Sequence, residues 1–339
     1  MLNKSVYSIS ISARVVLNLH SLNNEGSEGN QVQTRMVEVI YYDPDGEIKR
    51  DSVNAISGDM LKHIQSEHLH RIAIERNLPM CQPCRQFDPN RIAADEDYLG
   101  TIEGQSNQFA IDELLRRCAI TDLEGTLITK AGREKRSLPR KSVAEFAWMT
   151  GVPGAMASSS YFHVKFASEH GDSSSAVDES GTVAGKQTPF HRPTNSGVYA
   201  LVCSFEPSRI GYNDISQEYA KNTDPSPIDR TARYKALLES VIYTFVQMNG
   251  AMRSAQMPHL TAFHGVIATS YGVAPAPSVS PLNPKFVTEI EQTKDAINGL
   301  HKKIGNTDQD VIAVRPFADI AQFAEILRDL IENTEPYAL

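Results

Sequence analysis

Apolar and polar residues alternate along the first part of the chain with a two-residue period. Every odd position from Tyr7 to Leu19 is apolar, whereas the even positions are almost all polar. This period is typical of a β-strand with one buried face. The polar, glycine-containing residues 20–30 follow and favour a loop. A strand with a cationic, amide-bearing outer face and a polar lip suits an extended polymer, and a half-exposed edge strand with an ordinary turn explains the pattern equally well.

Strand and helix patterns alternate along the rest of the chain. Further strands are expected at residues 35–42, 47–56, 161–166, 197–205 and 260–270. Helices are expected at residues 57–77, 111–118, 229–248, 285–303 and 317–331. Ser57 can cap the first helix, and the irregular, polar residues 80–107 predict an insertion. This order predicts an α+β fold of the ferredoxin-like or RRM-like type, with two helices on one face of the sheet and the other face free for RNA.

The chain is acidic overall but contains one strongly basic segment. Its 33 Lys and Arg residues against 41 Asp and Glu give a net charge of −8, so the surface as a whole does not attract nucleic acid. Residues 130–141 contain a single acid and six cations: Lys130, Arg133, Lys135, Arg136, Arg140 and Lys141. Because arginine and lysine bind phosphate oxygens, this segment is predicted to be an exposed phosphate-binding loop, although a solvated basic loop has the same composition.

A second candidate contact for phosphate lies at residues 249–254. Gly250 lets the backbone approach a ligand closely, and Arg253 can pair with a phosphate. A helix end followed by an arginine in a loop is the alternative explanation.

The cysteines and the apolar segments limit the classes of protein to which the chain can belong. Four cysteines in 339 residues do not indicate a disulfide framework. Cys81 and Cys84 resemble half of a zinc site, but no second close pair follows, and His68 and His70 point in different directions from a helix. No metal or other cofactor is therefore predicted. Without a stretch of about 18 apolar residues or an apolar signal core, the protein is predicted to be soluble and cytoplasmic, with no membrane partner.

Common enzyme motifs are absent from the sequence. It contains no G-x-x-x-x-G-K-[ST], H-E-x-x-H or G-x-S-x-G pattern. Asp172 and Asp178 lie in a Gly- and Ser-rich segment and could assist RNA cleavage, although such acids more often keep a loop soluble. The chain is predicted not to be an enzyme.

Several segments, taken together and in order, resemble one family. They are residues 11–30 (ISARVVLNLHSLNNEGSEGN), 34–35, 54–61 (NAISGDML), 118–125 (CAITDLEG) with the basic run, and 248–250 followed by Arg253 and Pro258. The set resembles the DevR-type autoregulator family, which supplies the Cas-seven backbone subunits of type I CRISPR surveillance complexes, called Cascade.

The resemblance implies a palm, a finger and a thumb. The RRM-like palm is expected at residues 1–76, 118–166 and 197–339, the helical finger at 77–117 and the thumb hairpin at 167–196. It also implies a non-catalytic subunit that lines up as a helical filament along CRISPR RNA and supports recognition of target DNA. The implied partners are CRISPR RNA, the target DNA strand, further copies of the chain, and the guide 5′-end cap, guide-processing, large and small subunits of Cascade.

The resemblance also implies which residues contact the guide RNA. They are His20, Ser21, Asn23, Asn24, Arg35, Ser57, Lys62, Arg136, Arg140, Lys141, Gly250, Met252, Arg253, His191 and Arg192. A helix N-terminus, as at Ser57, independently suits an anion because its free N–H groups point at the ligand. The Cys81–Cys84 pair and the helices after residue 284 lie outside the match.

Two other functions are open from the sequence. The first is a type III-like backbone ribonuclease that cuts target RNA with Asp172 or Asp178, which alanine variants and a cleavage assay would separate. The second is a metal-dependent or regulatory RNA-binding protein that acts alone, which zinc analysis and light scattering with RNA would separate.

Overall fold

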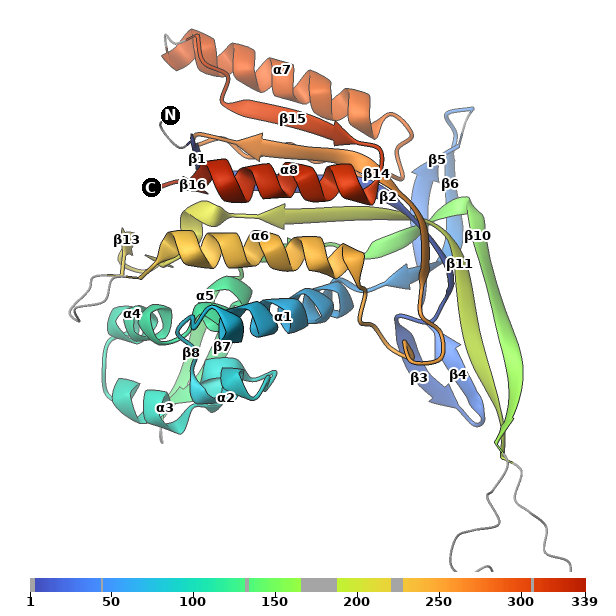
Figure 1. The fold of residues 1–339 in the computed structure, drawn as a ribbon, viewed down its shortest axis with the longest axis horizontal. Helices are drawn as coiled ribbons and strands as arrows, with labels where there is room; N and C mark the ends of the chain where they lie inside the picture. The colour runs from blue at the N-terminus through green and yellow to red at the C-terminus, as the bar shows by residue number, and fades with distance from the viewer. Residues whose placement is uncertain (1–3, 44, 132–133, 166–187, 221–227, 306–307) are drawn as a thin grey trace, which may run out of the picture.

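An antiparallel sheet forms the centre of the molecule (Figure 1). The computed structural model describes residues 4–43, 45–131, 134–165, 188–220, 228–305 and 308–339. Within them the main sheet follows the order β15-β14-β2-β11-β10-β6-β5. Its strands are β15 (Ile312–Phe317), β14 (His259–Ser270), β2 (Ser8–His20), β11 (Thr188–Phe205), β10 (Met149–Lys165), β6 (Ile48–Ile56) and β5 (Met36–Tyr42), with β3 (Asn24–Glu28), β4 (Gln31–Thr34) and β9 (Ala144–Phe146) attached.

Three short strand pairs and several helices complete the described fold. The pairs are β1 (Lys4–Val6) with β16 (Thr334–Pro336), β7 (Thr126–Ala131) with β8 (Glu134–Arg140), and β12 (Tyr212–Asn213) with β13 (Glu218–Tyr219). The helices are α1 (Gly58–Glu75), α2 (Gln82–Arg85), η1 (Arg91–Ala94), α3 (Glu96–Ile102), α4 (Asn107–Arg117), α5 (Ala119–Glu124), η2 (Pro207–Arg209), α6 (Arg230–Val246), α7 (Phe286–Gly305) and α8 (Ile320–Asn333). None of the helices in these ranges is long and apolar enough to cross a membrane.

The main core lies between the sheet and a layer of helices. Helices α1, α6 and α8 lie side by side across one face, with α6 in contact with both neighbours (Figure 1). The odd-numbered residues of β2, from Ile9 to Leu17, have no exposed surface, as the alternation predicts. Phe263 of β14 packs against Phe245 of α6 and Phe323 of α8, with ring centroids 5.1 and 4.9 Å apart. Burial of these faces provides the hydrophobic free energy that holds the helices on the sheet.

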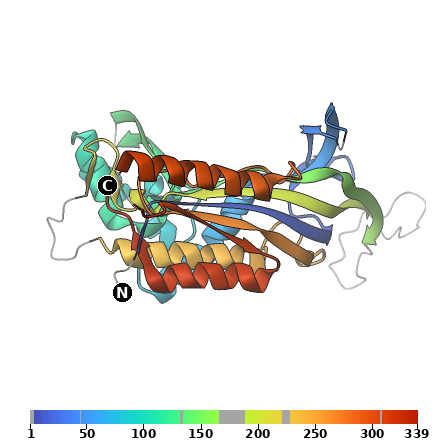
Figure 2. The same ribbon diagram turned by 90° about the horizontal axis from the view of Figure 1, so that it is seen from above.

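The other face of β2 is covered, which corrects the prediction that it is open to a polymer or to RNA. Ser10 Oγ donates to the carbonyl of Pro277 (2.5 Å), and the Arg14 guanidinium donates to the carbonyl of Pro281 (3.1 and 3.0 Å). Helix α7 packs on β14 and β15 through Phe286, on the side opposite α6 and α8 (Figure 2). Ser10 and Arg14 on this face of β2 therefore bind the chain's own proline-rich segment.

A long β-hairpin extends from one end of the sheet (Figure 1). Strands β10 and β11 pair from Thr150 and Ala200 to Lys165 and Thr188. The predicted strand at 161–166 thus pairs with the outer part of β11, around Phe190–Arg192, and not with 197–205, which pairs with β2. The strands are longer than their apolar alternation indicated. Of the predicted thumb, residues 188–196 belong to β11, whereas the rest, with Asp172 and Asp178, lies outside the described residues.

Most predicted elements are confirmed, and the combination of an antiparallel sheet with helices is confirmed with them. The segment 80–107, predicted to be irregular, contains α2, η1 and α3; of these, α2 contacts α1 (Figure 1). The basic segment 130–141 was predicted to be a loop, and that is wrong: its described part belongs to the β7–β8 pair. Strand β15 was not predicted. The RRM-like palm and the domain boundaries stay predictions.

Candidate nucleic-acid interface

The structure brings together three of the segments predicted to contact RNA. The side-chain oxygen of Asn23 accepts a hydrogen bond from the backbone N–H of Ser57 at the start of α1 (2.7 Å). The carbonyl of Leu22 accepts the N–H of Ala251 (3.0 Å). A side chain at Gly250 would place its Cβ 2.5 Å from Leu22 Cδ2 and 3.0 Å from the Leu22 carbonyl oxygen, so a larger residue would force Leu22 to shift. The segment after β2 is therefore held between α1 and the loop at residues 249–258.

Arg35 lies against the same segment. Its N–H donates to the carbonyl of Asn23 (3.4 Å), and its own carbonyl accepts the side-chain amide of Asn54 (2.9 Å). The guanidinium is 3.1 Å from a carboxylate oxygen of Glu25 and lies over the Trp148 ring, 5.2 Å from its centroid. Glu25 offsets part of the charge that Arg35 could offer to a phosphate.

His20 belongs to a buried hydrogen-bond network and does not face a ligand. Its Nδ1 accepts the N–H of Leu22 (3.4 Å), so its Nε2–H donates to the hydroxyl of Tyr199 (2.8 Å). Tyr199 in turn donates to Asn54 Oδ1 (2.6 Å). Burial lowers the pKa of His20 to about 4, which leaves the ring neutral at pH 7. The prediction that His20 contacts RNA is corrected: its buried side chain supports the segment after β2 from the protein interior.

Three other predicted contacts are also buried. Ser21 Oγ donates to the side-chain oxygen of Asn24 (2.8 Å), and Ser57 Oγ accepts the N–H of Met60 (3.2 Å) as the N-cap of α1. Asn23 is engaged with Ser57 as described above. These side chains shape the segment, so direct contact with RNA is corrected to a positioning role for Ser21, Asn23 and Ser57.

Arg140 is fully buried, which contradicts its predicted role as a phosphate ligand. Its Nη2 donates to Asp122 Oδ1 (2.7 Å) and to the carbonyl of Arg209 (2.7 Å). The other oxygen of Asp122 accepts from Arg233 (2.6 Å), and both side chains of this second pair are also buried. A buried carboxylate needs such partners, and the basic composition of segment 130–141 could not show that Arg140 supplies one.

Arg136 and Lys141, the other two predicted RNA contacts of this region, also have partners. Arg136 donates to the carbonyl of Gln105, next to α3. Lys141 is half-exposed and lies 3.2 Å from Glu145 and 3.4 Å from Glu206. Lys130 and Lys135 are exposed and lie opposite each other on the β7–β8 pair, so the described part of segment 130–141 distributes its cations between buried, paired and exposed positions.

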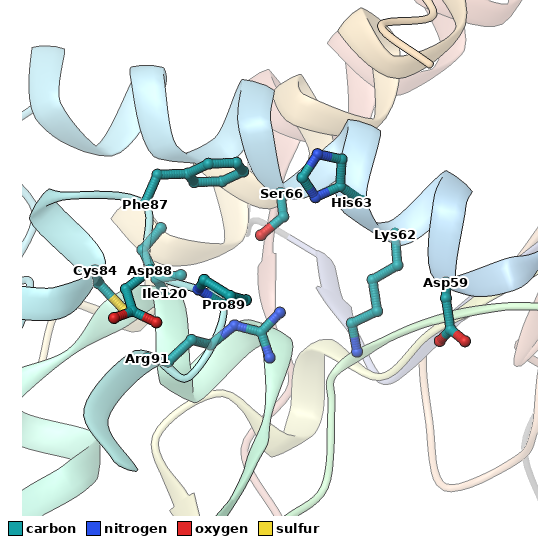
Figure 3. A pocket seen from close by; sticks show the side chains of 10 residues that line it. All are labelled: Asp59, Lys62, His63, Ser66, Cys84, Phe87, Asp88, Pro89, Arg91 and Ile120. Carbon is teal, nitrogen blue, oxygen red and sulfur yellow. The ribbon is translucent and has the colours of Figure 1, made fainter. Parts of the chain in front are cut away.

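Lys62 reaches into a cavity of about 400 Å³ beside α1, together with Arg91 (Figure 3). Its ammonium donates to Ser142 Oγ (2.6 Å) and lies 3.9 Å from the buried carboxylate of Glu124. Burial lowers the pKa of Lys62 and raises the pKa of Glu124, while each partner's charge works against the shift of the other. Lys62 is thus paired with Ser142 and Glu124.

An open groove lies between the β10–β11 hairpin and the loop that precedes β14. The groove has a volume of about 580 Å³, and Arg253 lines it. No hydrogen bond or ion pair of the Arg253 guanidinium is recorded among the described residues. Gln256 fixes the loop to the hairpin, because its side-chain amide donates to Thr194 Oγ1 (2.6 Å) and to the carbonyl of Pro193 (2.9 Å). Met252 begins the turn, with a φ of 55° and a carbonyl that accepts two N–H groups.

Aromatic side chains form the hairpin wall of this groove. Tyr161 and Phe162 are 52 % and 61 % exposed. The ring of Phe162 packs against His191 across the hairpin (5.4 Å), and His163 stacks on Phe190 (5.5 Å, 15°). Arg192, a predicted contact like His191, lies 4.8 Å from the centroid of the Phe190 ring. Sequence reasoning identified this strand but assigned no binding role to Tyr161, Phe162 or His163; the signal was the run of aromatic residues in a polar hairpin.

The chain belongs to the CRISPR-associated DevR/Csa2 family. The model of the family described as CRISPR-associated negative auto-regulator DevR/Csa2 matches residues 11–291. The family predicted from the sequence is therefore confirmed.

Two curated relatives come from Saccharolobus solfataricus (strain P2). CRISPR-associated protein Cas7/Csa2 1 is 24% identical over 301 residues, which cover 86% of this chain and 85% of the relative. CRISPR-associated aCascade subunit Cas7/Csa2 2 is 24% identical over 282 residues, which cover 80% and 82%. A chain of a solved structure titled CRISPR RNA-guided surveillance complex aligns with 12% identity over 96% of this chain and 98% of that chain, with a TM-score of 0.46.

Proposed function

We propose that this protein is a non-catalytic backbone subunit that binds CRISPR RNA in the groove between the β10–β11 hairpin and the loop at residues 249–258. The observation that carries the proposal is the groove itself, which is lined both by Arg253, a cation without a salt bridge among the described residues, and by the exposed residues Tyr161 and Phe162. A cation for the phosphate and flat rings for the bases are the two contacts that single-stranded RNA requires. Membership of the DevR/Csa2 family supports the assignment.

The proposed mechanism separates charge neutralisation from base stacking. Arg253, with Arg192 near the rings, binds phosphates, while Tyr161 and Phe162 stack on bases without selecting them. Asn24 and Arg35 extend the surface along the polar lip. RNA affinity then depends little on guide sequence, and pairing between guide and target DNA supplies the specificity.

The proposed partners follow from the same assignment. They are CRISPR RNA, the paired DNA strand, further copies of this chain along the RNA, and other Cascade subunits. One relative is named as an aCascade subunit, which supports a role within a complex. The chain is proposed not to cut RNA or DNA.

Arg253 provides the direct test. Fluorescence anisotropy with labelled single-stranded RNAs of different sequence should give similar affinities for the wild-type chain, and Arg253→Ala should bind all of them more weakly. Arg328→Ala, on the exposed face of α8, is the matched control and should bind as the wild type does. Equal binding by the two variants, or strong preference for one RNA sequence, would contradict the proposal.

Oligomerisation along the RNA is tested by a separate experiment. Light scattering should show the mass of the complex rising in steps with the length of the RNA, because a longer RNA accommodates more copies. Gel analysis of the same samples should show intact RNA. A single copy per RNA at every length, or shortened RNA, would argue for the solitary binder or the ribonuclease.

A further inference from the structure

A close pair of cysteines and a third that is distant in sequence meet at one point of the fold. The sulfur atoms of Cys81, Cys84 and Cys118 all lie within 4.8 Å of one another. All three residues are buried, and all are free thiols rather than disulfide partners. Cys81 and Cys84 belong to the α2 turn, and Cys118 immediately precedes α5. The third sulfur is the ligand that the sequence pattern of Cys81 and Cys84 lacked.

The spacing of the sulfur atoms suits a thiophilic metal ion. Zinc with bonds of about 2.3 Å in tetrahedral geometry holds its sulfur ligands about 3.8 Å apart. The observed upper limit of 4.8 Å is compatible with this spacing, whereas a disulfide would join only two of the sulfurs, at about 2.0 Å, and leave the third without a role. The C-x-x-C spacing places both sulfurs of the α2 turn on one side of a single ion.

Groups around the cluster orient its sulfurs. The backbone N–H of Thr121 donates to Cys118 Sγ (3.3 Å), and the Thr121 hydroxyl lies 3.7 Å from Cys84 Sγ. Hydrogen bonds of this kind, from groups that do not themselves bind the metal, hold metal ligands in position. The N–H of Ala119 donates to the carbonyl of Pro79 (2.8 Å), which joins the two ligand segments.

We propose that Cys81, Cys84 and Cys118 bind one Zn²⁺ ion, with a solvent oxygen as the fourth ligand. Cys84 also lines the cavity that contains Lys62 and Arg91, which lies beside the site (Figure 3). The ion connects the start of the helical segment α2–α4 to the start of α5, which follows it, and so stabilises the fold of this segment. The proposal does not depend on RNA binding.

Elemental analysis of the full chain, purified from zinc-supplemented cells without a chelator, tests the site. We expect one zinc ion per wild-type chain and its loss from Cys118→Ser. Cys203→Ser is the matched control, because Cys203 is a buried cysteine of β11 outside the cluster, and this variant should retain the metal.

A second measurement covers the case in which Cys118→Ser does not fold. Treatment of the folded wild-type chain with a mercurial reagent should release zinc in step with thiol modification, and removal of the zinc by a chelator should lower Tm. Zinc at buffer background in the wild type, an intact mass lower by two hydrogens, or equal zinc in both serine variants would overturn the proposal.

Discussion

At the scale of the residue, burial decides what a charged or titratable side chain does. Arg140 and Arg233 hold the two oxygens of Asp122 inside the molecule, whereas Arg253 lines an open groove. All three are arginines in polar stretches of sequence. Only the tertiary structure separates the two that support the fold from the one available to a ligand.

Removal of Arg140 should therefore damage stability rather than RNA affinity. Arg140→Ala leaves the Asp122 carboxylate with one partner fewer in the interior, a change that costs about 3–5 kcal/mol. Urea unfolding should show this loss, while Arg328→Ala should stay close to the wild type. If Arg140→Ala kept full stability and lost RNA binding, the assignment of Arg140 to the core would be wrong.

His20 should make stability depend on pH. Its pKa is about 4 in the folded chain and 6.5 when unfolded, so between these values the unfolded state binds the additional proton. The free energy of unfolding contributed by His20 is complete above pH 6.5 and falls by roughly 3 kcal/mol as the pH drops to 4. The difference between wild type and His20→Gln, measured by urea unfolding across this range, should show the slope. Parallel curves would contradict it.

At the scale of the element, local patterns could be predicted and long-range partners could not. The buried face of β2, the Ser57 cap and helices α6, α7 and α8 each follow from residues close in sequence. Strand β15 was not predicted because it is short and contains Pro316. Strands that contain proline occur at the edges of sheets.

Much of the candidate site could not be predicted from the sequence, for a related reason. Ser10 and Arg14 bind a proline-rich segment 267 residues away, which no local pattern reveals. The groove likewise combines residues around Tyr161 with a loop near Arg253. Gly250 and Arg253 were predicted as phosphate contacts because a glycine followed by an arginine is a local signal. The aromatic wall could not be predicted, because it depends on how the two strands of the hairpin pair.

The hairpin wall should contribute stacking to RNA binding. Tyr161→Ala removes one exposed ring from the groove and should cost about 1–3 kcal/mol of binding free energy, roughly 5- to 150-fold in Kd. Its matched control is Tyr42→Ala, which removes an exposed tyrosine from β5 and should leave affinity unchanged. Anisotropy titrations compare the two. Equal effects of both changes would argue against the groove as the place where bases stack.

At the scale of the whole molecule, an acidic protein must hold a polyanion through a local surface. The chain has a net charge of −8, and many of its cations are already paired with carboxylates. RNA binding should therefore weaken as salt rises, with a slope of about −0.7 in log K against log salt for each phosphate contact. Titrations at several salt concentrations should give a shallower slope for Arg253→Ala than for the wild type. A flat wild-type dependence would contradict charge neutralisation.

The most direct measurement is photo-crosslinking of the chain to single-stranded RNA, followed by mass spectrometry of the crosslinked peptides. The groove predicts crosslinks within residues 161–163 and 253–257, which line it, and within residues 190–192, which pair with 161–163 across the hairpin. Crosslinks confined to α7 and α8, or to segment 130–141 alone, would show that RNA binds elsewhere on the molecule.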